Sequence, residues 1–176
     1  MCDYPENDVS EVIPNLWLGN VKAAYNKNFL EKYKIKNILT IMDNFDNNKK
    51  FNTIKYLIIP IKDKHSCNTN MIKIFDISTL FIYNSLKNNE GILVHCKQGH
   101  HRSASLVVAF LIKYLKTDYQ RALQYIKYLR PCAVRRNTCM SNNLFTYYLH
   151  INNIQSCDVK CGVDNNIYSC KCSTNF

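Results

Sequence analysis

The sequence predicts an α/β fold, with a central, mostly parallel sheet flanked by helices in a single domain. Short apolar runs rich in β-branched residues alternate along the chain with longer segments of helical spacing. Hydrophobic residues make up 47% of the 176 residues, which is enough to bury one core. Only 4 Gly and 4 Pro interrupt the chain, which argues against flexible linkers and low-complexity arms.

The first third of the chain contains three candidate strands and one candidate helix. Residues 12–18 predict a short strand or hairpin that ends in a turn at the following Gly-Asn pair. Residues 23–33 have helical spacing. Residues 37–42 and 54–59 are mostly apolar, β-branched runs, typical of buried strands.

The remaining two thirds of the chain continue this alternation. Thr117 and Gln120 predict a capping box at the start of a helix, and Pro131 predicts its end. The other expected elements are a helix over 70–86, a buried strand at 92–94, an apolar helix over 103–116, the capped helix from 117 to about 129, and an amphipathic helix over 141–151.

The net charge is +10, from 23 basic and 13 acidic side chains. Such a charge attracts polyanions, including phosphoproteins, phosphoinositides and nucleic acid. The basic residues are scattered, however, and a solvated surface of lysines explains them equally well. The charge therefore selects no partner by itself.

The N-terminus lacks the pattern of a targeting segment. Residues 1–10 are acidic and have no apolar core, so they do not predict a signal peptide. The longest apolar run, residues 106–112, is far shorter than the ~20 residues that a membrane span needs. These features predict a soluble, cytoplasmic protein, whose nine Cys are expected to be reduced thiols.

The segment from residue 91 to residue 103 carries the most chemistry. A buried strand is expected to end at His95 and a helix to begin near Ser103, with Cys96, Gly99 and Arg102 close to the turn between them. Backbone amides of such a loop and of the helix start can converge on an anion. The planar guanidinium of Arg102 can contact two phosphate oxygens at once.

The same loop makes Cys96 a candidate nucleophile. Amides, a helix N-terminus and a guanidinium all favour the thiolate form of a cysteine. Ser103 can donate a hydrogen bond to the sulfur when it leaves, and His95 is expected to bond the loop backbone rather than act as a base. The alternative is a buried structural cysteine beside an unrelated arginine, which the strand, the helix and Gly99 argue against.

Several segments spread over residues 11–150 resemble the dual-specificity protein phosphatases, within the cysteine-based tyrosine phosphatase superfamily. Residues 16–20 and 40–43 are most similar to poxvirus members, which together with the Asn- and Lys-rich composition suggests a viral source. The segments are 13–20 (opening strand), 33–40 (next strand), 59–63 (entry to the general-acid loop), 95–103 (phosphate loop) and 129–131 (a late helix end).

The resemblance implies a tyrosine-phosphatase-like fold and a function. Residues 11–151 would form the catalytic domain, after an extension over 1–10 and before a Cys-rich tail over 152–176. The implied activity is hydrolysis of phosphotyrosine, phosphoserine and phosphothreonine in proteins through a phosphocysteine intermediate, without metal or other cofactor. The alternatives are a phosphatase of RNA 5′-ends or phosphoinositides, motivated by the positive charge, and a catalytically weak module that binds phosphate groups.

The resemblance also implies a general acid at Asp63. The leaving oxygen needs a proton, and a carboxylic acid on a loop can supply it. A solvated turn carboxylate is the alternative for Asp63, while Asp76 is a poorer candidate because it lies within helical spacing.

The phosphate loop departs from the family where His100 and His101 replace small residues. The two imidazoles can add positive charge below neutral pH or point to solvent. Cys67 lies near the expected acid loop. It is either an idle thiol or the partner of Cys96 in a protective disulfide that forms under oxidation. The residues expected to bind the substrate phosphate are Lys97, Gln98, Gly99, His100, His101 and Arg102.

The tail contains four Cys whose role the spacing leaves open. They are Cys157, Cys161, Cys170 and Cys172. Their spacing is unlike the paired two-residue knuckles of common zinc sites. Zinc binding, disulfide formation and an unremarkable tail therefore remain as alternatives.

Overall fold

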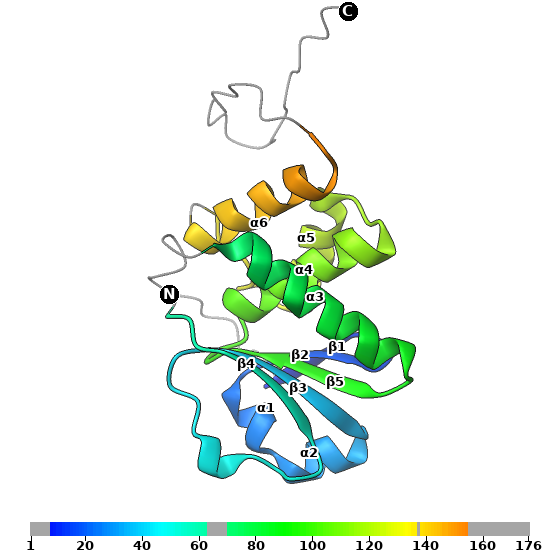
Figure 1. The fold of residues 1–176 in the computed structure, drawn as a ribbon, viewed down its shortest axis with the longest axis vertical. Helices are drawn as coiled ribbons and strands as arrows, with labels where there is room; N and C mark the ends of the chain where they lie inside the picture. The colour runs from blue at the N-terminus through cyan, green and yellow to red at the C-terminus, as the bar shows by residue number, and fades with distance from the viewer. Residues whose placement is uncertain (1–7, 63–69, 137, 155–176) are drawn as a thin grey trace, which may run out of the picture.

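The computed structural model describes residues 8–62, 70–136 and 138–154 (Figure 1). A five-stranded sheet of order β1-β2-β5-β3-β4 forms its centre. β2, β5, β3 and β4 pair in parallel, and β1 is antiparallel to β2. The strands are β1 (Val9–Ile13), β2 (Leu16–Gly19), β3 (Ile35–Ile41), β4 (Lys55–Ile59) and β5 (Gly91–His95).

Helices cover both faces of the sheet, which confirms the predicted α/β architecture (Figure 1). α1 (Val21–Tyr25) and α2 (Lys27–Lys32) lie on one face. The other face carries α3 (Met71–Lys87), α4 (Arg102–Leu115), α5 (Tyr119–Leu129) and α6 (Cys139–Ile151). A short 3-10 helix, η1 (Asn47–Lys49), lies between β3 and β4. No helix among the described residues is long and apolar enough to cross a membrane.

The alternation of side chains along β2 divides the core in two. Leu16 and Leu18 face the larger core, built with α3, α4 and α6, whereas Trp17 faces the smaller core with α1 and α2. Successive strand residues point to opposite faces, so a strand with helices on both sides is apolar throughout. α4 lies at the centre of the larger core and is buried over its first eleven residues, 102–112.

Two local predictions were wrong. The single helix expected over 23–33 is two helices, because the side chain of Asn26 accepts a hydrogen bond from Phe29 N–H and so starts α2 after α1 has ended. The cap of α5 is Asp118 rather than Thr117. Thr117 belongs to the end of α4: its N–H donates to Leu111 O after Lys116 takes the left-handed conformation that commonly closes helices.

The prediction that all the cysteines are reduced was wrong for two of them. Cys132 and Cys139 are disulfide-bonded. Spacing along the chain does not show which sulfur atoms the fold brings within bonding distance, so the sequence could not reveal this. Among the described residues, Cys96 is a free thiol.

Candidate active site

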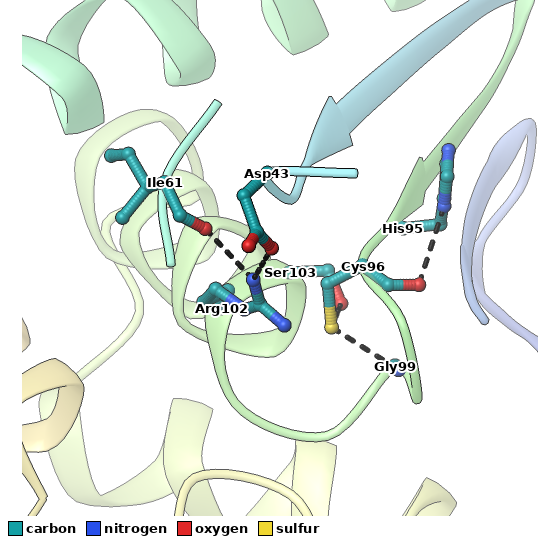
Figure 2. A network of polar contacts seen from close by, with 7 residues as sticks. All are labelled: Asp43, Ile61, His95, Cys96, Gly99, Arg102 and Ser103. Atoms are coloured by element: carbon teal, nitrogen blue, oxygen red, sulfur yellow. Dashed lines mark hydrogen bonds and ion pairs between the residues drawn. The ribbon is translucent and has the colours of Figure 1, made fainter. Parts of the chain in front are cut away.

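A loop over residues 96–101 joins the carboxyl end of β5 to the start of α4 (Figure 2). β5 is buried over its whole length and ends at His95. The loop therefore begins in the protein interior, at the edge of the sheet where the parallel strands end. In open α/β sheets this edge is where ligands bind.

Every carbonyl of the loop accepts a hydrogen bond from the surrounding protein. The donors are His95 Nδ1 to Cys96 O (3.3 Å), Val21 N to Lys97 O (3.3 Å), Arg130 Nη2 to Gln98 O (3.4 Å), Arg130 Nε to Gly99 O (3.2 Å), Val134 N to His100 O (2.8 Å) and Ser105 N to His101 O (2.9 Å). The N–H and C=O of a trans peptide point in opposite directions, so carbonyls turned outward leave the amides turned inward. Inward amides are what an anion requires.

The sulfur of Cys96 lies against one of these amides and against a serine hydroxyl of α4 (Figure 2). Its side chain is buried, and its Sγ accepts hydrogen bonds from Gly99 N–H at 3.2 Å and from Ser103 Oγ at 3.3 Å. Hydrogen bonds to an atom that carries charge favour its charged form. Both contacts therefore favour a thiolate at this position.

Gly99 has the backbone conformation and the space that only glycine fits. Its φ is +75°, and a Cβ at this position would lie 2.6 Å from Gly19 O. It would also lie 3.0 Å from Arg130 Nη2. The loop can therefore bend around an anion only because position 99 has no side chain.

Arg102 is the first residue of α4, and its guanidinium is nearly buried beside Cys96 (Figure 2). Its Nη1 donates to Ile61 O at 2.8 Å and lies 3.7 Å from Asp43 Oδ1. Ile61 follows β4 and Asp43 follows β3, so three strand ends meet at this arginine. Asp43 was not predicted as a site residue; its signal in the sequence is its place directly after the apolar run at 37–42.

His95 supports the loop from inside the sheet. Its buried ring contacts Thr40 Oγ1 through Nε2 at 2.8 Å and Cys96 O through Nδ1 at 3.3 Å. Because a carbonyl only accepts, Nδ1 carries the hydrogen and Nε2 accepts from Thr40. Burial lowers the pKa of His95 to about 4, so the ring is neutral near pH 7. The expected backbone role of His95 is confirmed.

The other predicted phosphate-site positions differ in exposure. The side chains of Lys97 and Gln98 are exposed at the rim, whereas His100 and His101 are partly buried. His101 Nδ1 accepts a hydrogen bond from the backbone N–H of Arg135 at 3.3 Å. This contact ties the second imidazole to the segment between α5 and α6, so it does not simply point to solvent.

Asp76 belongs to a different cluster, on α3. It accepts hydrogen bonds from Lys113 Nζ at 2.6 Å and from Tyr147 Oη at 2.8 Å. Burial raises the pKa of this carboxyl, but the two hydrogen bonds and the nearby charges of Lys113 and His150 together outweigh burial and hold the pKa below its usual value. A carboxylate kept ionised in this way is a poor proton donor, in keeping with the lower rank given to Asp76.

Several predicted residues lie outside the described residues: Asp63, Cys67, Cys157, Cys161, Cys170 and Cys172. Among the residues that the structure does describe, no group of three or more His, Cys, Asp or Glu side chains could hold a metal ion. The roles predicted for Asp63 and for the tail cysteines thus stay predictions.

Comparisons with known proteins agree with this geometry. The family model of the dual specificity phosphatase catalytic domain matches residues 16–150. A probable dual specificity protein phosphatase of Dictyostelium discoideum is 37% identical over 140 residues, which are 80% of this chain and 63% of that protein. Dual specificity protein phosphatase 22-B of Danio rerio is 38% identical over 138 residues, 78% of this chain and 73% of that protein.

Solved structures show the same fold. The crystal structure of DUSP15 matches with a TM-score of 0.74 and 26% identity, over 83% of this chain and 91% of that one. The relatives named here come from cellular organisms, so the expected likeness to poxvirus members finds no support in them. Because the family model matches most of its length, the chain belongs to the family of dual specificity phosphatase catalytic domains.

Proposed function

We propose that this chain hydrolyses phosphate monoesters of proteins, on phosphotyrosine as well as phosphoserine and phosphothreonine, with Cys96 as the nucleophile. One observation carries the proposal. The Cys96 sulfur lies at the base of a loop whose six carbonyls are all bonded outward, with the Arg102 guanidinium beside it. A thiolate that faces a bound phosphoryl group is placed for attack.

In the first step, the inward amides of the loop and the Arg102 guanidinium bind the phosphate oxygens and stabilise the charge that spreads over them. Cys96 Sγ attacks phosphorus, so that a P–S bond forms while the P–O bond to the substrate side chain breaks. The leaving oxygen takes a proton from a carboxylic acid, which we assign to Asp63.

In the second step, water attacks the phosphorus of the phosphocysteine, and the Asp63 carboxylate removes its proton. The P–S bond breaks and the sulfur leaves as a thiolate. Ser103 Oγ, 3.3 Å from Cys96 Sγ, donates a hydrogen bond to the departing sulfur. Ser103 thus assists the return of the enzyme to its starting state.

Arg102 also joins the loop to the segment that precedes Asp63. Its Nη1 donates to the carbonyl of Ile61, two residues before Asp63 in the sequence. The nearby Asp43 carboxylate holds the same nitrogen from the side of β3. Phosphate binding at Arg102 is therefore coupled to the position of the strand end that leads to the proposed acid.

The remaining predictions concern the bounds of the catalytic domain, the substrate class, the source and the location of the protein. We place the catalytic domain at residues 11–151, which includes the family match over 16–150. The net charge of +10 supports anionic, phosphorylated protein substrates. A viral origin and a cytoplasmic location stay predictions from the sequence.

The proposal is tested by hydrolysis of phosphotyrosine and phosphothreonine peptides under reducing conditions with a chelator present. We expect turnover of both peptides by the wild type, none by Cys96→Ser, and a strong loss with Asp63→Asn. Asp118→Asn is the matched control, because it makes the same change at a helix cap where Asn serves as well as Asp. Its turnover should equal that of the wild type.

Other outcomes separate the alternatives. Faster turnover of triphosphorylated RNA or of phosphoinositides than of either peptide would replace protein by RNA or lipid as the substrate. Binding of the phosphopeptides without turnover, by a folded wild type, would leave a binding module in place of an enzyme.

A further inference from the structure

We propose that Arg130 is a positioning residue for this site: its guanidinium, behind the phosphate loop, fixes two loop peptides and polarises the amide that donates to Cys96 Sγ. The inference rests on the proposed function, because it names a residue that acts on the nucleophile through the loop. Arg130 itself lies outside the ring of inward amides and is not expected to touch the substrate.

The guanidinium of Arg130 connects three parts of the molecule. Arg130 is 1% exposed. It caps the end of α5, where its backbone N–H donates to Ile126 O at 2.8 Å. From there Nε donates to Gly99 O at 3.2 Å, Nη2 to Gln98 O at 3.4 Å, and Nη1 to Ser10 Oγ on β1 at 3.3 Å. Two of the six loop carbonyls thus depend on one side chain.

The contact with Gln98 O reaches the nucleophile through a single peptide. Gln98 O and Gly99 N–H belong to the same amide, and that N–H donates to Cys96 Sγ at 3.2 Å. A hydrogen bond to the carbonyl of an amide makes its N–H a stronger donor, since bonds in a chain polarise one another. The Arg130 cation therefore strengthens the bond that favours the Cys96 thiolate.

Arginine suits this position better than lysine. The guanidinium carries five N–H donors in a planar fork and is less strongly hydrated than an ammonium group, so it can be buried against several acceptors. A lysine has one nitrogen at the end of its chain and cannot contact Gln98 O, Gly99 O and Ser10 Oγ in the same arrangement.

Arg130 holds the middle of the loop through its side chain, so a substitution can remove this anchor. Lys97 O, His100 O and His101 O are held by backbone N–H groups, which no side-chain change deletes. Replacing Arg130 removes the donors to the middle of the loop and leaves those three anchors in place. A specific loosening of the peptides at Gln98 and Gly99 should follow.

The test compares Arg130→Met, which keeps the length of the stem but has no donor, with Arg130→Lys. Arg121→Met, at an exposed position on the same helix α5, is the matched control. Three quantities are measured: the pH profile of Cys96 alkylation by iodoacetamide, read by mass spectrometry of the Cys96 peptide; the affinity for tungstate, an oxyanion; and kcat and KM on p-nitrophenyl phosphate.

For Arg130→Met we expect the alkylation profile to move to higher pH and tungstate affinity to fall about tenfold or more, since hydrogen bonds to charged groups have effects of this size. The kcat of Arg130→Met should fall along with its tungstate affinity. Arg130→Lys should recover part of both losses, and Arg121→Met should match the wild type. The other charged or titratable groups around the loop are the same in every variant: Asp43, His95, Lys97, His100, His101 and Arg102.

A folded Arg130→Met with the wild-type alkylation profile and tungstate affinity would overturn the inference, because a merely structural role changes only stability. If Arg130→Met does not fold, Arg130→Lys decides by the same two measurements. Neither measurement requires turnover. A wild type without activity would therefore count against the proposed function, whereas unchanged alkylation and tungstate binding in the variants would count against Arg130 alone.

Discussion

The starts of α4 and α6 are built in opposite ways. At α6 the Thr138 side chain accepts a hydrogen bond from Ser141 N–H, and Ser141 Oγ in turn accepts from Thr138 N–H, a closed capping box. At α4 the N-cap residue is His101, whose side chain makes no capping hydrogen bond. Among the helices that the structure describes, the other N-caps are Asn or Asp side chains that accept from the first turn.

The difference fits the proposed role of the start of α4 in binding an anion. A capping side chain occupies the place where an anion would bind and satisfies the amides by itself. At α4 the chain keeps that place open and orders the loop from behind, through donors to its carbonyls. The positive end of the α4 dipole then acts on the Cys96 sulfur and on a bound phosphate.

The largest expected effect comes from Gly99→Ala, which breaks the order of the loop at its tightest point. The new Cβ would meet Gly19 O at 2.6 Å, and φ of +75° strains any residue but glycine. We expect kcat/KM to fall about 100-fold or more, because displaced catalytic groups cost at least that much. Gly91→Ala, which meets backbone at the other end of β5, is the control. It should lower stability while keeping activity per folded molecule, and similar losses in both variants would contradict the prediction.

A substitution at His95 tests the hydrogen bond that this residue donates to Cys96 O, the first carbonyl of the loop. Burial lowers the pKa of His95 from 6.5 to about 4, so the neutral ring stabilises the fold fully above about pH 6.5. That contribution is lost as the pH falls from 6.5 towards 4. Between pH 7 and pH 5 we expect this histidine to reduce the free energy of unfolding by about 2 kcal/mol.

Urea unfolding of the wild type and of His95→Gln at both pH values checks this expectation. The variant has a lower stability throughout but should lack this part of the pH dependence. The other four histidines are the same in both proteins, so their contributions cancel in the comparison. Equal pH dependence in the two proteins would mean that His95 titrates normally in the folded state.

His101→Asp places a capping residue at the start of α4 and so removes the difference between the two helices. The new carboxylate can accept from the α4 amides and repels a bound phosphate. We expect kcat/KM to fall about tenfold or more, with a change in the free energy of unfolding of no more than about 1 kcal/mol. Asn89→Asp adds a negative charge at an exposed site before β5 and should leave kcat/KM unchanged. Activity retained by His101→Asp would show that no anion uses this helix start.

The smallest effect is expected at α5, where Asp118 accepts hydrogen bonds from the N–H groups of Gln120 and Arg121. Asp118→Ala removes this cap and should lower the free energy of unfolding by about 1 kcal/mol. Asp118→Asn should keep most of that stability. Urea unfolding measures both variants, and turnover at 25 °C should equal that of the wild type in each. A loss of activity in Asp118→Ala would show that α5 transmits strain to the loop.

Much of the fold and the centre of the site follow from the sequence alone. The apolar runs at 37–42 and 92–94 contain strands that are buried almost throughout, as a strand covered by helices on both faces must be. The run at 54–59 also contains a strand, but β4 lies at the edge of the sheet and is only partly buried, so the burial expected for it was wrong. The loop of Cys96 and Arg102 is predictable because its residues are neighbours in the chain, between a strand and a helix. Local spacing carries the information in both cases.

Contacts between distant segments were decided only by the tertiary structure. Asp43 and Ile61 meet Arg102 because parallel strands end at one edge of the sheet, and Arg130 reaches Gln98 O and Gly99 O from the end of α5. The sequence can place Asp43 after a strand and Arg130 near the end of a helix, but it does not show which groups they contact, since each partner is set by the packing of whole elements. The sequence by itself determined which atoms can do the chemistry, and the tertiary structure decided what holds them in place.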